Sequence, residues 1–405
     1  MDIKDKIKNN KIIYTLFKPL YRFYIDFIIL RFIGIIFRIF PIKKNKIVVC
    51  SYYGNGYGDN PKYIIDELKK NKKLDIVWAL NKNNYLSELP ENVRRVKYET
   101  LKYLYELCTA KIWIDNCRKS YVPPKRKKQY YIQTWHGSFA IKKIELDARE
   151  SLPKLYIKRA MIDSKNANLF TSGSAWTDEI YRRAFNYHGK ILDCGDPRND
   201  ILFARNKHKN IRNSVIKKIN IKEKGIIILY APTFRKNQST ECYDIDFERL
   251  LKAIEKKYNK DCYILIRLHP NIASKDKNFK YNKNIINVTK YPDIQELMIA
   301  ADILITDYSS SMFEFGITKK PCFLYTKDIE EYKQDRDLYF DFKKLPFPLA
   351  TKDDELIKNI NLFDSQKYLE ELEKFYNKIG AFKAGNASVQ VAKIILKECE
   401  LDEKK

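Results

Sequence analysis

From residue 46 onward, the chain alternates short apolar runs with segments of helical spacing. The apolar run at 47–51 is typical of a buried strand, and Asp59-Asn60-Pro61 is typical of a helix start, because proline fits the first helical turn. This alternation favours a parallel sheet with crossover helices. In this half we expect strands at 47–51, 75–80, 110–115 and 130–135, and a helix at 61–70.

A second series of the same kind begins at residue 225, after a stretch rich in Lys and Asn that we interpret as an interdomain linker at 206–224. We therefore predict an α/β protein with two Rossmann-like, doubly wound domains, at 47–205 and 225–405, that face a cleft. In the second domain we expect strands at 225–230, 262–267, 285–288, 303–306 and 322–325, and helices at 247–258, 294–301, 310–316 and 388–399.

Residues 1–46 carry eleven Lys or Arg and three Asp, which gives a net charge of +8. An apolar and aromatic stretch at 14–42 is interrupted by charges, so it is a poor match to the roughly 20 apolar residues of a spanning helix. No small-residue cleavage site follows, which argues against a signal peptide. We predict a basic amphipathic segment that lies on anionic membranes. The alternative is a helix packed on the protein's own core.

The whole chain has 405 residues, 45% of them hydrophobic, and a formal net charge of +26. Such an excess points to polyanionic partners, although the heavy use of Lys, Asn and Ile also fits coding bias. The eight cysteines include no CxxC pair, so we expect buried thiols and no structural zinc site.

Polar residues gather after the predicted strands, where parallel sheets bind their ligands. The first cluster is QTWHGS at 133–138, which places His136 beside a glycine at a strand end. An imidazole with an ordinary pKa near 6.5 can act as a general base at neutral pH. A histidine satisfied in the core is the alternative, and with only four histidines in the chain we favour a catalytic one.

The second cluster is RLHP at 267–270, which repeats this arrangement in the second half of the chain. Arg267 and His269 can contact a phosphate or stabilise charge on a leaving group. The alternative is a histidine that only caps the strand end.

The third cluster is TDYSSS at 306–311, directly before a predicted helix. Free N–H groups at a helix start favour an anion, so we interpret Thr306, Asp307, Ser309, Ser310 and Ser311 as a phosphate cradle without P-loop glycines. One turn later, Glu314 can bond ribose hydroxyls. In APTFR at 231–235, Arg235 is expected near the same cleft.

Two further loops carry weaker signals. GDPRND at 195–200 is a polar turn that closes the first predicted domain. GNGYG at 54–58 lacks the GxGxxG spacing, so we do not predict phosphate binding there.

Taken together and in this order, QTWHGS, GDPRND, YAPTFR, RLHP and TDYSSSMFEFG resemble the CDP-glycerol glycerophosphotransferase family of teichoic-acid primases, polymerases and capsule enzymes. The resemblance runs from about Cys50 to Ser388 and implies a GT-B-like fold. It implies that His136 acts as base on the acceptor hydroxyl and that His269 engages the donor diphosphate. The CDP site would include Asp307, Ser309, Ser310 and Glu314, with Arg235, Arg267, Thr306 and Ser311 as further donor-binding residues.

The sequence departs from the family pattern on what would be the acceptor side. Residues 137–142 read GSFAIK where relatives often carry GTPLK, and Gly-Asp-Pro at 195–197 replaces a commoner Gly-Ser-Pro. Because of these changes, the sequence does not determine the identity of the acceptor. The residues that we assign to this side are Gly137, Ser138, Lys142, Arg198, Asn199 and Asp200.

The resemblance implies transfer of glycerol phosphate from CDP-glycerol to an acceptor hydroxyl, with release of CMP, at the cytoplasmic face of a bacterial membrane. Expected partners are a CDP-linked polyol donor, a lipid-linked or glycan polyol-phosphate acceptor and the anionic membrane surface. No nucleic acid is expected, because no nucleic-acid module is recognisable. We expect no tightly bound cofactor and no metal ligands; a divalent cation stays open, but no residue pattern indicates one.

Three alternatives remain at this point. The same motifs permit ribitol-phosphate transfer from CDP-ribitol, and the same two-domain fold permits a sugar transferase or a sugar-nucleotide epimerase. The charge of +26 also permits a non-catalytic polyanion-binding protein. Primase and polymerase activity are equally open.

Overall fold

The computed structural model describes residues 30–119, 122–222, 224–235, 243–269, 272, 279–335, 337–382 and 385–401. Most of the membrane-associating segment predicted at 1–46 therefore lies outside the described residues. The chain divides into two compact units. Unit 1 comprises Met1–His136, Lys158–Phe170 and Val389–Lys405, and unit 2 comprises Gly137–Ile157 and Thr171–Ser388.

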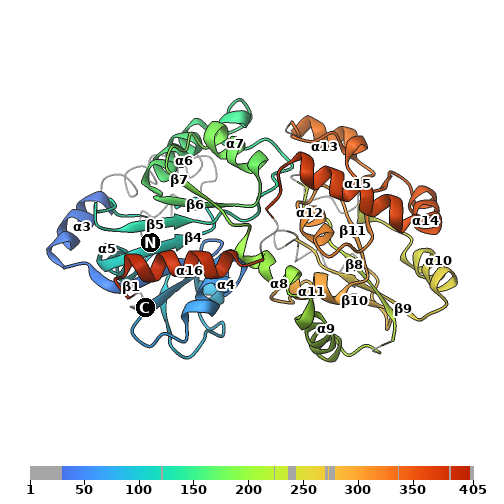
Figure 1. The fold of residues 1–405 in the computed structure, drawn as a ribbon, viewed down its shortest axis with the longest axis horizontal. Coiled ribbons are helices and arrows are strands. Elements are labelled where there is room, and N and C mark those ends of the chain that lie inside the picture. The colour runs from blue at the N-terminus through green and yellow to red at the C-terminus, as the bar shows by residue number, and fades with distance from the viewer. Residues whose placement is uncertain are drawn as a thin grey trace, which may run out of the picture. The chain divides into compact units, whose positions relative to one another are not determined.

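The first sheet has seven strands in the order β3-β2-β1-β4-β5-β6-β7 (Figure 1). Strand β1, inside this sheet, pairs in parallel with two neighbours, so that Val48 lies beside Val77 and Trp113. The apolar end of β1 is fully buried, as in parallel sheets covered on both faces. The strands are β1 (Lys43–Cys50), β2 (Asp75–Leu80), β3 (Val93–Lys97), β4 (Ala110–Asp115), β5 (Tyr130–Gln133), β6 (Leu169–Ser172) and β7 (Lys190–Asp193).

Among the helices that accompany this sheet, α4 buries an apolar stripe. In α4 the buried side chains include Ile64, Ile65 and Leu68, which share one helical face. The start of α5 is capped by Thr100, whose hydroxyl accepts from the Tyr103 N–H at 3.3 Å. The helices are α3 (Leu30–Ile36), η2 (Phe37–Ile39), α4 (Asp59–Leu68), η3 (Lys82–Asn84), α5 (Leu101–Thr109), η4 (Glu145–Ala148), α6 (Lys154–Asn166), α7 (Ala175–Ala184) and α16 (Ala387–Glu398).

The second sheet has six parallel strands in the order β10-β9-β8-β11-β12-β13. Leu229, Leu265 and Leu304 come from three adjacent strands and are completely buried. Apolar runs of this kind stay buried because packing covers both faces of the sheet. The strands are β8 (Ile226–Tyr230), β9 (Cys262–Ile266), β10 (Ile285–Asn287), β11 (Ile303–Thr306), β12 (Cys322–Tyr325) and β13 (Leu349–Ala350).

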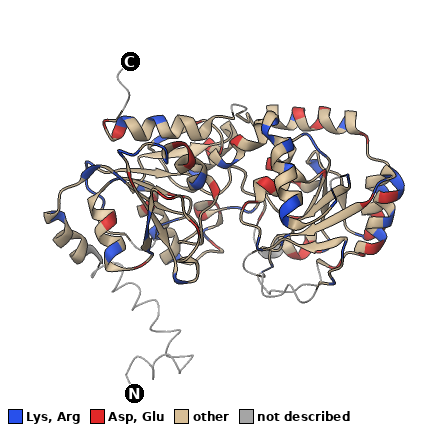
Figure 2. Cartoon of the chain, turned by 90° about the horizontal axis from the view of Figure 1, so that it is seen from below, with Lys and Arg blue, Asp and Glu red and all other residues tan. Residues whose placement is uncertain are grey.

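The helices that accompany the second sheet expose most of their charged residues, apart from Arg198 in η5 and Glu314 in α12. Figure 2 shows Lys, Arg, Asp and Glu mostly on helices and loops, with few on the strands. In α10 the buried residues are Leu250, Leu251 and Ile254, and Asp246 caps its start. The helices are η5 (Pro197–Asn199), α8 (Asp200–Phe203), α9 (Arg205–Ile219), α10 (Phe247–Tyr258), α11 (Ile294–Ala300), α12 (Ser311–Gly316), α13 (Ile329–Asp335), η8 (Phe342–Lys344), α14 (Asp353–Asn361) and α15 (Ser365–Lys378).

The predicted α/β class with two parallel sheets is confirmed. The stretch expected as a linker at 206–224 is mostly the helix α9, because Val215 and Ile216 are buried and Ile211 and Ile219 pack against the same core. These apolar positions share one helical face despite the Lys- and Asn-rich composition. The compact units also differ from the predicted domain boundaries, since Val389–Lys405 belongs to unit 1.

Among the residues that the structure describes, none of the helices is both long and apolar enough to cross a membrane.

Candidate active site

His136 lies in the loop after β5 and is half-buried. Its Nδ1 atom is 2.8 Å from the backbone oxygen of Asn116, which follows β4. Because a carbonyl oxygen only accepts, Nδ1 carries the proton, and the Nε2 atom keeps its lone pair. The ring stacks on Trp135 at 4.3 Å between centroids and lies 5.7 Å from the ring of Tyr52. This tautomer is the one that a general base requires.

The backbone before His136 is held by buried amides. Trp135 has φ of 50°, a left-handed conformation that is uncommon for a residue with a side chain. Its N–H donates to Gln133 Oε1 at 2.9 Å, and its carbonyl accepts from Asn60 Nδ2 at 3.1 Å. Asn60 and Gln133 are both completely buried. Sequence reasoning read Asn60 only as part of a helix start and missed this contact.

A buried polar network continues below the loop. Gln133 Nε2 donates to the Tyr131 hydroxyl at 2.9 Å, and that hydroxyl donates to Asp163 Oδ1 at 3.1 Å. Arg118 Nη1 lies 3.2 Å from Asp163 Oδ2, and the Arg118 guanidinium sits 5.3 Å from the Trp135 ring. Burial raises the pKa of Asp163, while Arg118 lowers it. The loop that carries His136 thus rests on a buried ion pair in unit 1.

Asp307, at the end of β11, is the centre of the predicted donor site in unit 2. Its Oδ1 atom accepts from the Thr233 N–H at 2.8 Å, and its Oδ2 atom lies 2.9 Å from Arg235 Nη1. Arg235 Nη2 also donates to Asp328 Oδ1 at 3.0 Å. Burial raises the pKa of Asp307, with Arg235 opposing it. The two predicted residues therefore meet, together with Asp328, which carried no sequence signal.

The Arg235 guanidinium is 93% buried and sits among aromatic rings. It lies 4.9 Å from the centroid of Tyr308 and 5.1 Å from that of Tyr332. With two carboxylates as partners, its charge is already compensated within unit 2. Arg235 therefore holds together the loops after β8, β11 and β12, and its own contacts are to protein carboxylates.

The serine run surrounds the start of α12, a helix of six residues. Ser309 Oγ accepts from the Ser311 hydroxyl at 2.8 Å, and Ser310 is the N-cap residue, with no side-chain hydrogen bond to the helix. Ser309 and Ser310 are half-buried, whereas Ser311 is buried. Thr306 lies deeper, and its hydroxyl donates to the Ala231 carbonyl at 2.7 Å. The Thr306 side chain therefore bonds to the backbone that directly follows the neighbouring strand β8.

Glu314 joins the predicted donor residues to the predicted acceptor side. One oxygen of Glu314 pairs with Arg198 Nη2, and the other accepts from Gln295 Nε2 at 2.9 Å. All three side chains are at least 93% buried. Gly137 lies against the same group, since a Cβ atom there would stand 3.1 Å from Arg198 Nη2 and 3.4 Å from Ser310 Oγ. Sequence reasoning found Arg198 and Glu314 but missed Gln295.

His269 follows β9, as predicted, and packs 4.7 Å from the ring of Phe234. Burial, followed by the charge of Arg267, lowers the pKa of His269 to about 4, so the ring is neutral at physiological pH. The Arg267 guanidinium donates to the backbone oxygen of Tyr291. A neutral imidazole offers one N–H donor and no charge.

The remaining acceptor-side residues take structural partners in unit 2. Ser138 Oγ donates to Asp196 Oδ1 at 2.7 Å, and Lys142 Nζ lies 3.9 Å from the centroid of the Tyr332 ring. Asp200 accepts from the Ser388 N–H at 2.7 Å and so caps the start of α16. Asn199 lies beside Asp196, with its Nδ2 atom 3.5 Å from Asp196 Oδ2.

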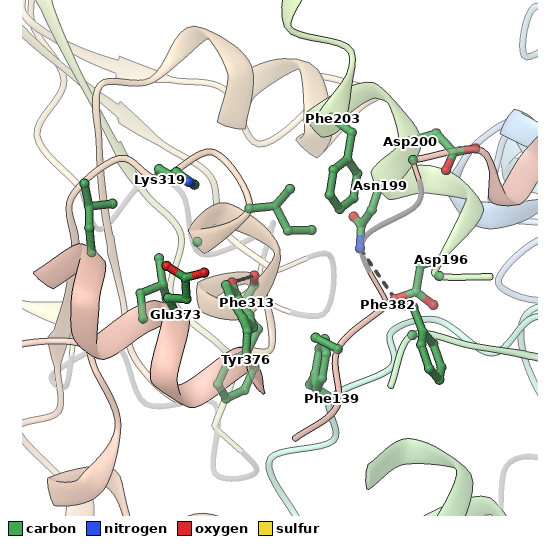
Figure 3. A pocket seen from close by; sticks show the side chains of 18 of the residues that line it. Phe139, Asp196, Asn199, Asp200, Phe203, Phe313, Lys319, Glu373, Tyr376 and Phe382 are labelled. Atoms are coloured by element: carbon green, nitrogen blue, oxygen red, sulfur yellow. Dashed lines mark hydrogen bonds between the residues drawn. The ribbon is translucent and has the colours of Figure 1, made fainter. Parts of the chain in front are cut away.

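Asn199 and Asp200 line a cavity of about 740 Å³ in unit 2 (Figure 3). Its walls come from the loop of Phe139, from α8, from the end of α12 and from α15. In the described part of the chain, no group of three His, Cys, Asp or Glu side chains is arranged to hold a metal ion.

Comparison with known proteins identifies the family. The family model described as CDP-glycerol:poly(glycerophosphate) glycerophosphotransferase matches residues 33–397. A teichoic acid poly(glycerol phosphate) polymerase of Bacillus spizizenii is 32% identical, over 91% of this chain and 97% of that protein. The polymerase of the same name in Bacillus subtilis is 30% identical over 88% of this chain, which spans 49% of that longer protein.

A solved structure of a related polymerase has a similar fold. A structure of the wall teichoic acid polymerase TagF superimposes with a TM-score of 0.79 at 28% identity, and covers 97% of this chain and 99% of its own. The match covers nearly the whole chain and therefore includes both parallel sheets. The chain belongs to the CDP-glycerol:poly(glycerophosphate) glycerophosphotransferase family.

Proposed function

We propose that this protein transfers glycerol phosphate from CDP-glycerol to an acceptor hydroxyl and releases CMP, in the synthesis of a teichoic-acid or capsule-type polymer. The observation that carries the proposal is the His136 ring, whose Nδ1–H is held by the Asn116 carbonyl in a chain of this family. That bond leaves Nε2 as the acceptor for the proton of the incoming hydroxyl.

The proposed reaction is an in-line displacement at the β-phosphorus of the donor. The acceptor oxygen forms a bond to phosphorus while its proton goes to His136 Nε2, and the bond from phosphorus to the bridging oxygen breaks. CMP leaves with that bonding pair, and His136 returns its proton to the solvent or to CMP. The contribution of the protein is positioning and charge stabilisation.

The donor residues divide into two roles in this proposal. His269, Ser309 and Ser310 supply hydrogen-bond donors to the phosphates, and Arg267 adds positive charge. Arg235, Asp307 and Glu314 hold the loops that present them, because their charges are paired inside unit 2. A neutral His269 fits a hydrogen-bonding role better than proton transfer.

The test is CMP release from the purified chain with three donors: CDP-glycerol, CDP-ribitol and a UDP-sugar. We expect turnover with CDP-glycerol and an acceptor that ends in a polyol phosphate. Faster turnover with CDP-ribitol would move the assignment to ribitol-phosphate transfer, and turnover with the UDP-sugar alone would overturn it. An equal concentration of CMP serves as product control.

We also propose that the protein binds the cytoplasmic face of the membrane peripherally. Within the described residues, α3 and η2 expose Phe32, Ile35 and Ile39 at 65%, 56% and 77%. Exposed apolar side chains of this kind favour the headgroup region of a bilayer, and residues 1–46 carry a net charge of +8.

Vesicle sedimentation tests this association. We expect the protein to sediment with phosphatidylglycerol vesicles at low salt and to be released by salt, since ionic screening weakens attraction to the headgroups. Phosphatidylcholine vesicles are the matched control. A Phe32→Ser and Ile39→Ser double variant should bind more weakly, whereas full binding by this variant would assign the contact to another surface.

A further inference from the structure

The cavity in unit 2 has aromatic walls. Five rings line it, and they come from four separate segments of the chain, as Figure 3 shows for the labelled side chains. Flat rings offer a ligand broad contact with C–H groups at little entropic cost. The five are Phe139, Phe203, Phe313, Tyr376 and Phe382.

One buried polar atom in this cavity has no hydrogen-bond partner. Asn199 is 95% buried, and its Nδ2 atom faces Asp196, which fixes the orientation of the amide. The Oδ1 atom on the other side is unpaired. In Figure 3 the Asn199 side chain lies at the edge of the space between Phe203 and α15. The oxygen has almost no exposed surface, so a ligand hydroxyl or N–H reaches it only when the amide rotates toward the cavity. Such a bond would recover the cost of about 1–3 kcal/mol of a buried oxygen without a donor.

The charged groups that line the cavity select against anions. Four carboxylates, those of Asp196, Asp200, Glu370 and Glu373, face one ammonium, that of Lys319, among the described lining residues. The lining of the cavity therefore carries more negative than positive charge, although the whole chain has a net charge of +26. Carboxylates accept hydrogen bonds but repel phosphate, so the site suits a ligand that is rich in donors and carries no negative charge.

We propose that this cavity binds a neutral saccharide ring. The C–H face of the ring would lie against the aromatic walls, and its hydroxyl groups would donate to Asn199 Oδ1 and to the carboxylates. The role of the sugar rests on the proposed function, because it would be the neutral glycan part of the acceptor. A polyol-phosphate chain has the wrong charge for this site.

Binding of small glycosides tests the proposal directly. Methyl glycosides of a hexose and of an N-acetylhexosamine are titrated into the full chain by saturation-transfer NMR, with glycerol 3-phosphate and benzylammonium as competing probes. We expect saturable binding of a neutral glycoside, and weaker or no binding of glycerol 3-phosphate. Tighter binding of glycerol 3-phosphate or of benzylammonium than of either glycoside would overturn the assignment.

Two variants locate the site. Asn199→Leu removes the unpaired acceptor and should weaken glycoside binding about 3- to 10-fold, the equivalent of one hydrogen bond. Asn199→Asp keeps an acceptor and should retain most of the affinity. Phe382→Leu, on another wall, removes one ring and should also weaken binding. Unchanged affinity in both Asn199→Leu and Phe382→Leu would overturn the site.

The CDP response separates this inference from the proposed function. Thermal melting with CDP should show the same stabilisation in the native chain and in both cavity variants. If CDP stabilises the protein and no glycoside binds, the saccharide site is wrong and the transferase proposal stands. If glycosides bind and CDP has no effect, the donor assignment fails instead.

A different observation in unit 1 carries a second inference. We infer that Asn60 and Gln133 are positioning residues for His136, because they hold the two polar atoms of the Trp135 peptide backbone directly before it. The left-handed φ of Trp135 costs energy, so this backbone persists only if its surroundings fix it. Loss of either amide would let His136 turn away from the Asn116 carbonyl.

The test compares kcat, KM and donor binding. Gln133→Leu and Asn60→Ala should lower kcat at least tenfold, while the KM for CDP-glycerol and the thermal shift with CDP stay within twofold. Gln133→Glu, protonated by burial, keeps an acceptor for the Trp135 N–H and should recover most of kcat. A loss of stability with normal kcat in the folded protein would show that both amides are only structural.

Discussion

The histidines after β5 and β9 both follow a parallel strand, but the two strands hold different places in their sheets and the surroundings of the two rings differ. His136 is oriented by a hydrogen bond of 2.8 Å from Nδ1 to a backbone oxygen and by stacking on Trp135. His269 packs on Phe234, and burial together with Arg267 lowers its pKa to about 4. One ring is therefore held in a fixed tautomer, and the other is kept neutral by its environment.

This difference fits the two tasks that the proposed function gives to the histidines. In the proposed mechanism, a general base needs its ring nitrogen in a fixed direction, and the hydrogen bond from Nδ1 to the Asn116 carbonyl orients the ring of His136. The same proposal gives His269 a hydrogen-bonding role toward the donor phosphates, and its low pKa keeps the ring neutral at physiological pH. Substitutions of single residues test whether the two histidines differ in this way.

The largest effect is expected from His136→Gln. Removing a general base typically costs 10²–10⁴ in rate, so transfer from CDP-glycerol should fall by about that factor. The variant keeps a side chain of similar size, and the thermal shift with CDP should not change. CMP release in a stopped assay gives the rate.

The control for this variant is His188→Gln at an exposed histidine, which should transfer at the normal rate. A His136→Gln enzyme with turnover within threefold of normal would remove the general base from the proposal and leave the role of His136 unexplained.

The sequence predicted the longer buried strands well because they are almost wholly apolar runs. β8, β9 and β11 were all found within one residue of each end. β3 was missed, since its pattern at Val93–Lys97 has three exposed charged residues, as suits an edge strand. The strands β6, β7 and β13, of two to four residues, were missed as well. The helix α9 was missed because Lys and Asn hid a narrow apolar stripe.

The candidate site was predictable only in part. Residues with reactive side chains at strand ends, such as His136 and Asp307, stand out in the sequence. Asn116 acts through its backbone oxygen, and Asp328 is an ordinary loop aspartate, so neither residue is marked by a motif in the sequence. Charge partners across a fold depend on tertiary packing, which is why the sequence marked Arg235 as a candidate donor-binding residue but did not reveal its pairs with two carboxylates.

The second-largest effect is expected for the Arg235→Ala variant, which should lose stability. The change leaves Asp307, which is 98% buried, without its charge partner. Breaking a buried pair by removing one partner typically costs about 3–5 kcal/mol, so the free energy of unfolding should fall by about that amount. Urea denaturation followed by fluorescence measures it.

Arg235→Lys is the matched variant, since it keeps the charge but loses the planar fork that reaches both carboxylates. We expect an intermediate loss. The surface variant Arg149→Ala, at an ion pair with both side chains exposed, should change stability by about 0.5 kcal/mol or less. Equal losses for Arg235→Ala and Arg149→Ala would contradict a structural role for the Arg235 pair.

The smallest expected effect is the dependence of stability on pH that His269 contributes. In the unfolded chain a histidine binds a proton below about pH 6.5, whereas the folded His269 binds one only near pH 4. Between these values the unfolded state holds more protons, so stability falls as the pH is lowered from 6.5 toward 4. The loss from this residue is at most about 3 kcal/mol, because one pKa unit corresponds to about 1.36 kcal/mol. His269→Asn should flatten the profile in this window. An unchanged slope in His269→Asn would show that His269 is protonated as easily in the folded protein as in the unfolded chain, and the contrast between the two histidines would then rest on His136 alone.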